Sequence, residues 1–187
     1  MHMKKIILGS FLLSTLLSAQ NAVSLNINDE DVEVQTSLDL NNFMSYTSGT
    51  LYTFDANYLH SDGDNLLGIG FSGENQLQGT NGLRVSLGLK AVFADEFAAI
   101  PLLARASYTL PLADTVPPIT VEMNVAYAPK ILSFNEAERY TEFRTQLGME
   151  LVPNIHLFTG YRYIDTDYKA FDHTFNESFY LGLKFGF

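Results

Sequence analysis

Apolar and polar residues alternate with a period of two along most of the chain after residue 21. Residues 83–93, 119–127 and 143–151 each place apolar side chains at every second position, and the positions between them are polar or small except for Val92. This alternation is typical of β-strands that have one apolar and one polar face. Because no segment of ten or more residues shows helical spacing, the sequence predicts an all-β fold.

Residues that favour turns separate the alternating segments. Residues 62–65 and 79–82 are rich in Asp, Asn and Gly, and Pro153 marks a tight connection. Pro101 weakens the start of one predicted strand, because proline cannot donate a hydrogen bond to a sheet. The predicted strands cover residues 22–28, 31–40, 50–60, 65–77, 82–93, 98–110, 118–128, 139–152, 154–166 and 176–187.

The first residues of the chain have the features of an export signal. Lys4 and Lys5 precede an apolar stretch over residues 6–17. Small residues follow, which predicts cleavage after Ala19, with Ala22 as the alternative site. The apolar stretch is well short of the ~20 residues that a membrane-spanning helix needs.

Removal of residues 1–19 leaves one domain, residues 20–187, with nine basic and 21 acidic residues and a net charge of −12. This balance argues against nucleic-acid binding, because no basic stripe is present to pair with phosphates. The chain contains no Cys, which excludes disulfides and thiolate metal sites. No later apolar run approaches the length of a spanning helix, so the domain either is soluble or crosses a membrane as strands.

The C-terminal segment favours a membrane barrel over a soluble β-sandwich, whose strands would also alternate. Its apolar residues occupy every second position up to the last residue, and a soluble domain gains little from such an ending. The pattern is similar to the signal by which the barrel-assembly machinery recognises outer-membrane barrels. The residues of this predicted assembly signal are Phe179, Leu181, Leu183, Phe185 and Phe187.

The polar face of the predicted strands carries seven acids and six bases, although the mature chain is strongly acidic. A narrow barrel interior would require such a balance, because charges removed from water need partners. The excess negative charge is then expected in the loops. The predicted lumen charges are Glu33, Asp39, Asp55, Glu74, Arg84, Lys90, Arg105, Glu122, Glu142, Arg144, Glu150, Arg162 and Lys184.

Glycines on the same face would make room for these long side chains in a narrow lumen. Arg162 lies between two tyrosines, so we expect it to point inward and to pair with Glu142 or Glu150 of the adjacent strand. The hypothesis is an interior plugged by ion pairs. The inward glycines are Gly68, Gly70, Gly88, Gly148, Gly160, Gly182 and Gly186.

Five ordered stretches resemble the YfaZ-type outer-membrane proteins of Gram-negative bacteria and together span nearly the whole mature chain. The resemblance implies a small outer-membrane β-barrel and brings no catalytic residues with it. The stretches are YLHSDGDNLLGIGFSGE (58–74), NGLRVSLGLKAVFAD (81–95), YAPKILSFNEAERYTEF (127–143), LVPNIHLFTGYRYIDTDY (151–168) and YLGLKFGF (180–187).

Residues suited to catalysis or metal binding are few. His60 and His173 are expected near the outer loops beside acids, but nothing orders them with a nucleophile, so polar loop residues are the favoured interpretation. Asp62, Asp64 and Asn65 could bind Ca²⁺ weakly, as could residues 28–31, yet the ligand series of an EF-hand is missing and turn formation explains both clusters. We therefore predict no catalytic residue, no metal and no cofactor.

These observations predict a transmembrane antiparallel up-and-down β-barrel in the outer membrane, with a closed lumen and an envelope role. Ten strands are favoured because bacterial single-chain barrels have even strand numbers, with both termini on the periplasmic side; eight is the alternative. Lipid, lipopolysaccharide at loops 128–139 and 166–174, and the assembly machinery are the expected partners. The competing hypotheses are a narrow channel for small solutes, an enzyme that acts on lipid or peptide, and a soluble lipocalin-like barrel.

Overall fold

The computed structural model describes residues 21–44, 48–112 and 116–187, so the predicted export signal lies outside the described residues. No helix in these ranges is long and apolar enough to cross a membrane. Two short 3-10 helices occur, η1 (Asn41–Phe43) and η2 (Lys130–Leu132). The strands are β1 (Ala22–Ile27), β2 (Asp31–Asp39), β3 (Leu51–Ser61), β4 (Asp64–Gln76), β5 (Leu83–Ala94), β6 (Phe97–Ala99), β7 (Leu102–Thr109), β8 (Ile119–Ala128), β9 (Ser133–Asn135), β10 (Ala137–Val152), β11 (Ile155–Tyr168) and β12 (Thr174–Gly186).

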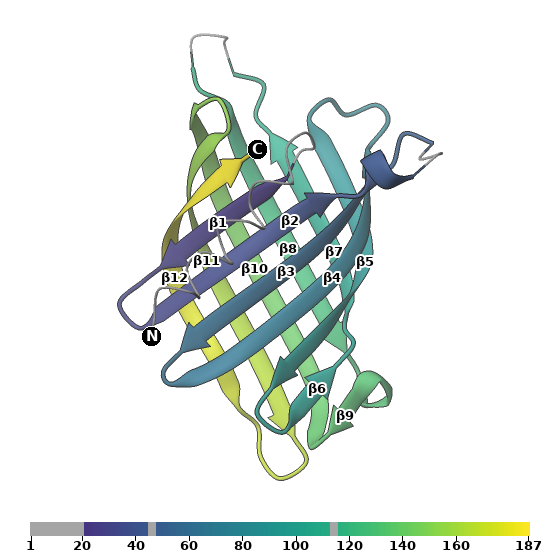
Figure 1. The fold of residues 1–187 in the computed structure, drawn as a ribbon, viewed down its shortest axis with the longest axis vertical. Coiled ribbons are helices and arrows are strands. Elements are labelled where there is room, and N and C mark those ends of the chain that lie inside the picture. Colours follow the sequence, from purple (N-terminus) through teal and green to yellow (C-terminus); the bar gives the residue numbers. More distant parts are fainter. Residues whose placement is uncertain (1–20, 45–47, 113–115) are drawn as a thin grey trace, which may run out of the picture.

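Ten of these strands close into one antiparallel barrel (Figure 1). Each barrel strand pairs with the next barrel strand along the chain, and β1 pairs with β12 to complete the ring. The two remaining strands, β6 and β9, pair with each other beyond one end of the barrel. The predicted up-and-down barrel of ten strands is therefore confirmed, and the alternative of eight strands is wrong.

The predicted strand 98–110 is divided into β6 and β7, with Ile100 and Pro101 between them. Pro101 is buried, and its carbonyl still accepts a hydrogen bond from the Lys90 amide at 3.0 Å. Because proline has no amide hydrogen of its own, pairing with β5 is interrupted at Pro101, and it resumes between β6 and the last residues of β5. Strand β9, inside the predicted loop 128–139, continues the sheet that β6 begins; the sequence prediction missed it.

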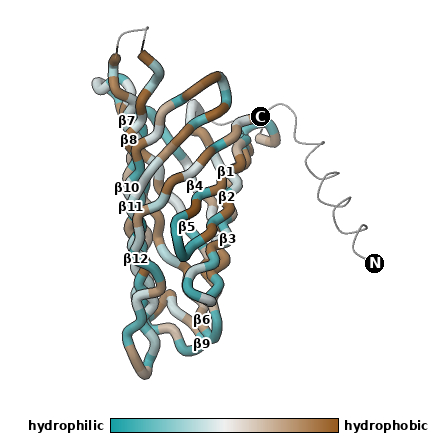
Figure 2. Tube along the Cα trace, turned by 90° about the vertical axis from the view of Figure 1, so that its left-hand side faces the viewer, coloured by the Kyte–Doolittle hydropathy of each residue, from teal (hydrophilic) through white to brown (hydrophobic). Residues whose placement is uncertain are grey.

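Apolar side chains point outward from the barrel and polar side chains point inward. Phe179 and Leu87 are 75% and 67% exposed, whereas Glu33 and Arg162 have no exposed surface. Figure 2 shows the two residue types alternating along the strands. This orientation is the reverse of that in a soluble barrel, in which the apolar face lines the core.

The two ends of the barrel differ in what they carry. Ala22 pairs with Gly186, so the start of β1 and the end of β12 lie at one end of the barrel, which we call the terminal rim. The opposite end, the distal rim, carries β6, β9 and the connections 27–31, 61–64 and 168–174. Inside the barrel near the distal rim lies a buried apolar cluster that includes Leu59, Leu66, Val92, Phe97, Ala126, Tyr140, Ile164 and Phe175. The sequence prediction of an ion-paired interior did not include this apolar layer.

Candidate functional site

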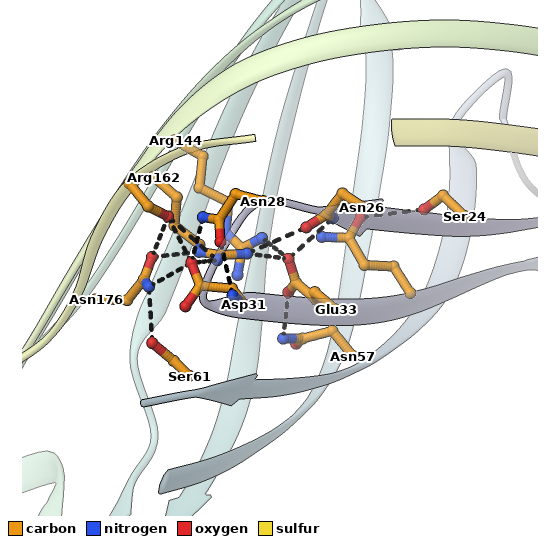
Figure 3. A network of polar contacts seen from close by, with 12 residues as sticks. Ser24, Asn26, Asn28, Asp31, Glu33, Asn57, Ser61, Arg144, Arg162 and Asn176 are labelled. Atoms are coloured by element: carbon orange, nitrogen blue, oxygen red, sulfur yellow. Dashed lines mark hydrogen bonds and ion pairs between the residues drawn. The ribbon is translucent and has the colours of Figure 1, made fainter. Parts of the chain in front are cut away.

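Arg162 is the centre of a buried polar network inside the barrel (Figure 3). Its Nη1 donates to Glu33 at 2.7 Å, and its Nη2 donates to Asp31 at 3.0 Å. Its Nε donates to the Asn176 side chain at 2.7 Å, and the guanidinium carbon lies 5.4 Å from the centre of the Tyr180 ring. The charge of this fully buried arginine is therefore balanced by two carboxylates of β2 and oriented by an amide of β12.

The prediction that Arg162 pairs with Glu142 or Glu150 is wrong. In the register of β10 and β11, the residue opposite Arg162 is Arg144, and Glu142 lies opposite Ile164. Like charges at adjacent positions cannot satisfy each other, so each arginine turns to other carboxylates. Asp31 and Glu33 reach Arg162 from β2, across the intervening strands β1 and β12.

A second part of the network runs from Lys90 to Glu33. The Lys90 Nζ atom donates to Glu142 Oε2 at 2.7 Å, and Arg144 Nε pairs with the other oxygen of that carboxylate. Arg144 Nη1 then donates to Glu33 at 2.7 Å, while Tyr140 donates to Glu142 at 2.7 Å. Because β5, β10 and β2 are not neighbours in the barrel, these contacts cross the lumen.

A separate ion-paired group lies on the terminal side of this network. Arg105 Nη2 is 3.7 Å from Asp55, and Arg105 Nε is 3.5 Å from Glu122. These residues come from β7, β3 and β8, so the group also joins strands that are not adjacent. It is more hydrated than the Arg162 network, because its side chains keep about a fifth to a third of their exposure.

The remaining predicted lumen charges lie nearer the terminal rim. Arg84 and Glu74 form a pair at 3.4 Å in which the arginine side chain is 56% exposed. Asp39 accepts from the Asn41 amide at 2.7 Å and so orders a turn. Glu150 and Lys184 have no ion-pair partner within the ranges that the structure describes. The interior thus joins most, but not all, of the predicted charges.

Several network residues were not predicted. Asp31 begins the predicted strand 31–40 but is absent from the predicted lumen charges, although its spacing from Glu33 places both on one face of β2. Asn26 and Asn57 donate to the two oxygens of Glu33 at 3.1 and 2.9 Å. Neutral amides give no charge signal in the sequence. Only their place in the alternation, which puts them on the inward face of the strand, could have identified them. They complete the hydrogen bonding of a carboxylate that is fully buried.

A cavity of about 130 Å³ lies among these residues. It is lined by groups that include Asp55, Arg105, Asn124 and Arg144. Arg144 Nη2 and Asn124 Oδ1 are buried there without a hydrogen-bond partner among the described residues. A polar cavity of this size has room for several water molecules, which would satisfy such groups.

Inward glycines provide space for the large side chains, as predicted from the sequence. A Cβ atom on Gly68 would overlap Asn57 and lie 2.5 Å from the Lys90 side chain. At Gly160 it would lie 2.6 Å from the Tyr180 hydroxyl. Both positions adjoin the buried network, so these glycines are part of its packing.

The histidines proposed for catalysis lie at the distal rim, but they are not assembled with a nucleophile. His60 is exposed and its Nδ1 lies 2.9 Å from Asn65 Oδ1. Ser61 is buried on the opposite face of β3 and accepts from Asn176 at 2.9 Å. His173 Nε2 is 3.8 Å from Asp64. Because successive side chains of a strand point to opposite faces, the Ser61 hydroxyl and the His60 imidazole lie on opposite faces of β3.

Comparisons with known proteins agree with this architecture. A family model described as YfaZ precursor matches residues 3–187. Among solved structures, a KdgM porin in complex with disordered oligogalacturonate is similar at 12% identity with a TM-score of 0.50, over 90% of this chain and 99% of the porin chain. A NanC porin is 10% identical with a TM-score of 0.39, over 89% of this chain and 99% of the other. No curated protein sequence matches the chain significantly. The first likeness supports a porin-type barrel fold.

Proposed function

Because the chain belongs to the YfaZ family, we propose that it is an outer-membrane barrel whose lumen is closed to ions and whose role lies in the cell envelope. Outward apolar side chains support the membrane location, because lipid is the solvent that favours them. Most of the barrel strands are long enough: β4, β5 and β12 have 13, 12 and 13 residues, whereas β1 has six and β7 has eight. Crossing the hydrocarbon layer requires about 9–11 residues in a tilted strand.

The observation that carries the closed lumen is the series of contacts from Lys90 through Glu142 and Arg144 to Glu33. It connects β5, β10 and β2 across the interior, and each of its side chains is at least nine-tenths buried. The apolar cluster near the distal rim blocks the same route a second time. A hydrated ion would have to displace both layers to pass.

Energetics favour the closed state. Removing one partner from a buried ion pair costs about 3–5 kcal/mol, because the other charge is left without compensation. A pathway through the network would have to separate at least the Lys90–Glu142 and Arg144–Glu33 pairs. Water in the opened path would recover part of that free energy, but in the apolar cluster the Tyr140 hydroxyl is already engaged by Glu142 and the other side chains offer water no hydrogen bond.

Planar-bilayer conductance tests the proposal. The refolded full-length mature protein is expected to give no steady current, while a general porin in the same membranes serves as the positive control. The variant Arg84→Ala, which removes an exposed pair at the terminal rim, should also remain silent. A steady porin-like conductance of the unmodified protein would refute the closed lumen.

A narrow channel for small solutes is the second candidate function. The polar cavity with unpartnered groups of Arg144 and Asn124 favours it, as does the fold likeness to a porin bound to oligogalacturonate. Swelling of liposomes that contain the protein, measured in neutral sugars of increasing size, distinguishes the two. Selective uptake of the smaller sugars would support the channel, and no uptake would support the closed barrel.

Export and outer-membrane insertion belong to the same proposal. We place cleavage after Ala19 and not after Ala22. Ala22 of β1 pairs with Gly186 of β12, so its removal would shorten the strand that closes the barrel. Cell fractionation is expected to find a mature protein beginning at Gln20 in the outer membrane. Its mobility on a gel should change with boiling, and recovery in the soluble periplasmic fraction would contradict the assignment.

The orientation of the barrel follows from the position of its ends. If both termini face the periplasm, the distal rim with loops 128–139 and 166–174 faces the cell exterior. Ile131 and Phe134 are exposed there and would reach the lipopolysaccharide layer. Protease added to intact cells should then cleave within these loops and leave the connection 76–83 intact; the reverse pattern would invert the orientation.

A further inference from the structure

A cleft of about 500 Å³ opens at the distal rim, outside the buried lumen network. One wall is aromatic: the Tyr168 and Phe171 rings stack with centres 4.9 Å apart and planes 14° apart. His173 and Phe175 continue the wall, with the His173 ring 6.4 Å from Phe171 and 6.3 Å from Phe175. Phe171 is 58% exposed. A folded loop therefore presents stacked rings to solvent instead of burying them.

The other walls of the cleft carry carboxylates. Asp64, Asp95, Glu96 and Glu136 all line it. The Tyr168 hydroxyl donates to the Asp95 carbonyl at 3.1 Å, which holds the aromatic wall against the acidic turn. The aromatic and acidic walls are thus parts of one connected structure.

Basic side chains near this rim are already engaged with other acids. Lys130 pairs with Glu138, and Arg139 pairs with Asp167. Lys169 is 3.5 Å from Glu136 and also donates to the Asn135 carbonyl at 2.6 Å. These three bases therefore contribute little to the charge balance of the remaining carboxylates in the cleft.

Two carboxylates of the cleft, those of Asp95 and Glu96, have no ion-pair partner among residues 21–44, 48–112 and 116–187. Asp64 has only His173, at 3.8 Å. In the same ranges, no three His, Asp or Glu side chains come together closely enough to hold a metal ion. The negative charge is therefore spread around a space that is much larger than an inorganic ion.

The geometry points to a binding site for a small organic cation, an ammonium group attached to an apolar body. The cationic group would lie between Asp95 and Glu96, and the apolar body would pack on the exposed face of Phe171. Aromatic faces attract cations through the ring quadrupole, and clefts of roughly 300–1,000 Å³ are typical of small-molecule sites. The inference does not depend on whether the lumen conducts.

Benzyltrimethylammonium is a suitable probe, because its charge is permanent and its body is one aromatic ring. Benzyl alcohol is the matched neutral compound. Calorimetric titration of the refolded full-length mature barrel is expected to show saturable binding of the cation, about ten-fold tighter than that of the alcohol. Raising the salt concentration should weaken the cation alone, because screening acts on charges at a surface.

Variants separate the two walls. Phe171→Ala should weaken cation binding about three- to ten-fold, and the double change Asp95→Asn with Glu96→Gln should weaken it at least as much. Matched controls at the same rim are Phe134→Ala and the double change Asp29→Asn with Glu30→Gln, which lie outside the cleft. Gel mobility with and without boiling verifies that each variant is folded. Equal binding of benzyl alcohol, or equal losses in the controls, would overturn the inference.

Discussion

Replacement of Arg162 by Met tests whether the lumen network holds the barrel together. Methionine is close to arginine in length but carries no charge and donates no hydrogen bond. The change removes the contacts of Arg162 with Glu33, Asp31 and Asn176, all between buried side chains. It leaves the strand backbone and the packing against Tyr180 largely in place.

The expected loss of stability depends on which hydrogen-bond donors Glu33 and Asp31 retain in the variant. Glu33 still contacts Arg144 at 2.7 Å, and Asp31 still accepts from Asn176 and Ser178, each at 2.8 Å. Removing a buried partner outright costs about 3–5 kcal/mol. Because both carboxylates retain other donors, we expect a loss at the lower end of this range: Arg162→Met should reduce the free energy of unfolding by about 3 kcal/mol.

Urea unfolding of the barrel refolded in lipid vesicles measures this loss, with the boiling-dependent gel mobility as the second probe. The matched control is Arg84→Met, whose exposed pair with Glu74 should contribute at most about 1 kcal/mol. Combining Arg162→Met with Glu33→Gln should cost less than the sum of the single changes, with a coupling of about 1–3 kcal/mol. If Arg162→Met costs no more than Arg84→Met, the buried network does not stabilise the barrel.

Three further changes test other features of the barrel. Gly88→Ala should lower the free energy of unfolding by about 1–3 kcal/mol, because the added Cβ would overlap the Phe71 carbonyl. Gly148→Ala is the control and should be nearly neutral, since the atom nearest to its Cβ would be 3.7 Å away. Urea unfolding of the two variants measures the difference. Leu89→Arg places a charge on the outward face and should cost about 2–4 kcal/mol in vesicles if that side chain lies near the bilayer midplane; a cost near zero would contradict contact with lipid. Phe187 follows the last residue of β12, so Phe187→Ala should slow assembly in cells and leave the urea unfolding of the refolded protein unchanged. Gel mobility after pulse-chase labelling measures the rate of assembly. Equal rates for the variant and the unmodified protein would refute the assembly signal.

The strands could be predicted because their signal is local. The segment expected at 82–93 is β5, Leu83–Ala94, and the segment expected at 31–40 is β2, Asp31–Asp39. A period of two is read within a few residues and needs no knowledge of distant partners. The exception, 98–110, failed at Pro101, the residue that the sequence had already identified as a weak point.

The partners of the lumen charges could not be predicted because they depend on closure of the ring. The flanking tyrosines correctly indicated that Arg162 points inward, but its partners lie on β2, separated from it by more than 125 residues of sequence. Adjacent-strand reasoning offered Glu142 or Glu150, and the register instead places Arg144 opposite Arg162. Register and barrel diameter are properties of the whole sheet.

The charges inside the barrel and the charges at the distal rim differ in burial and in pairing, and this difference indicates which of them can bind a ligand. Inside, Glu33, Glu142 and the cations around them are buried and mutually paired, so an incoming ligand would have to break contacts that hold strands together. At the distal rim, Asp95 and Glu96 lie at the surface beside aromatic rings and have no cation of the described chain to pair with. Hydrated carboxylates lose little when they bind a cation, whereas buried ones would first lose a partner. Binding at this protein should therefore occur at the rim and not among the paired charges of the interior.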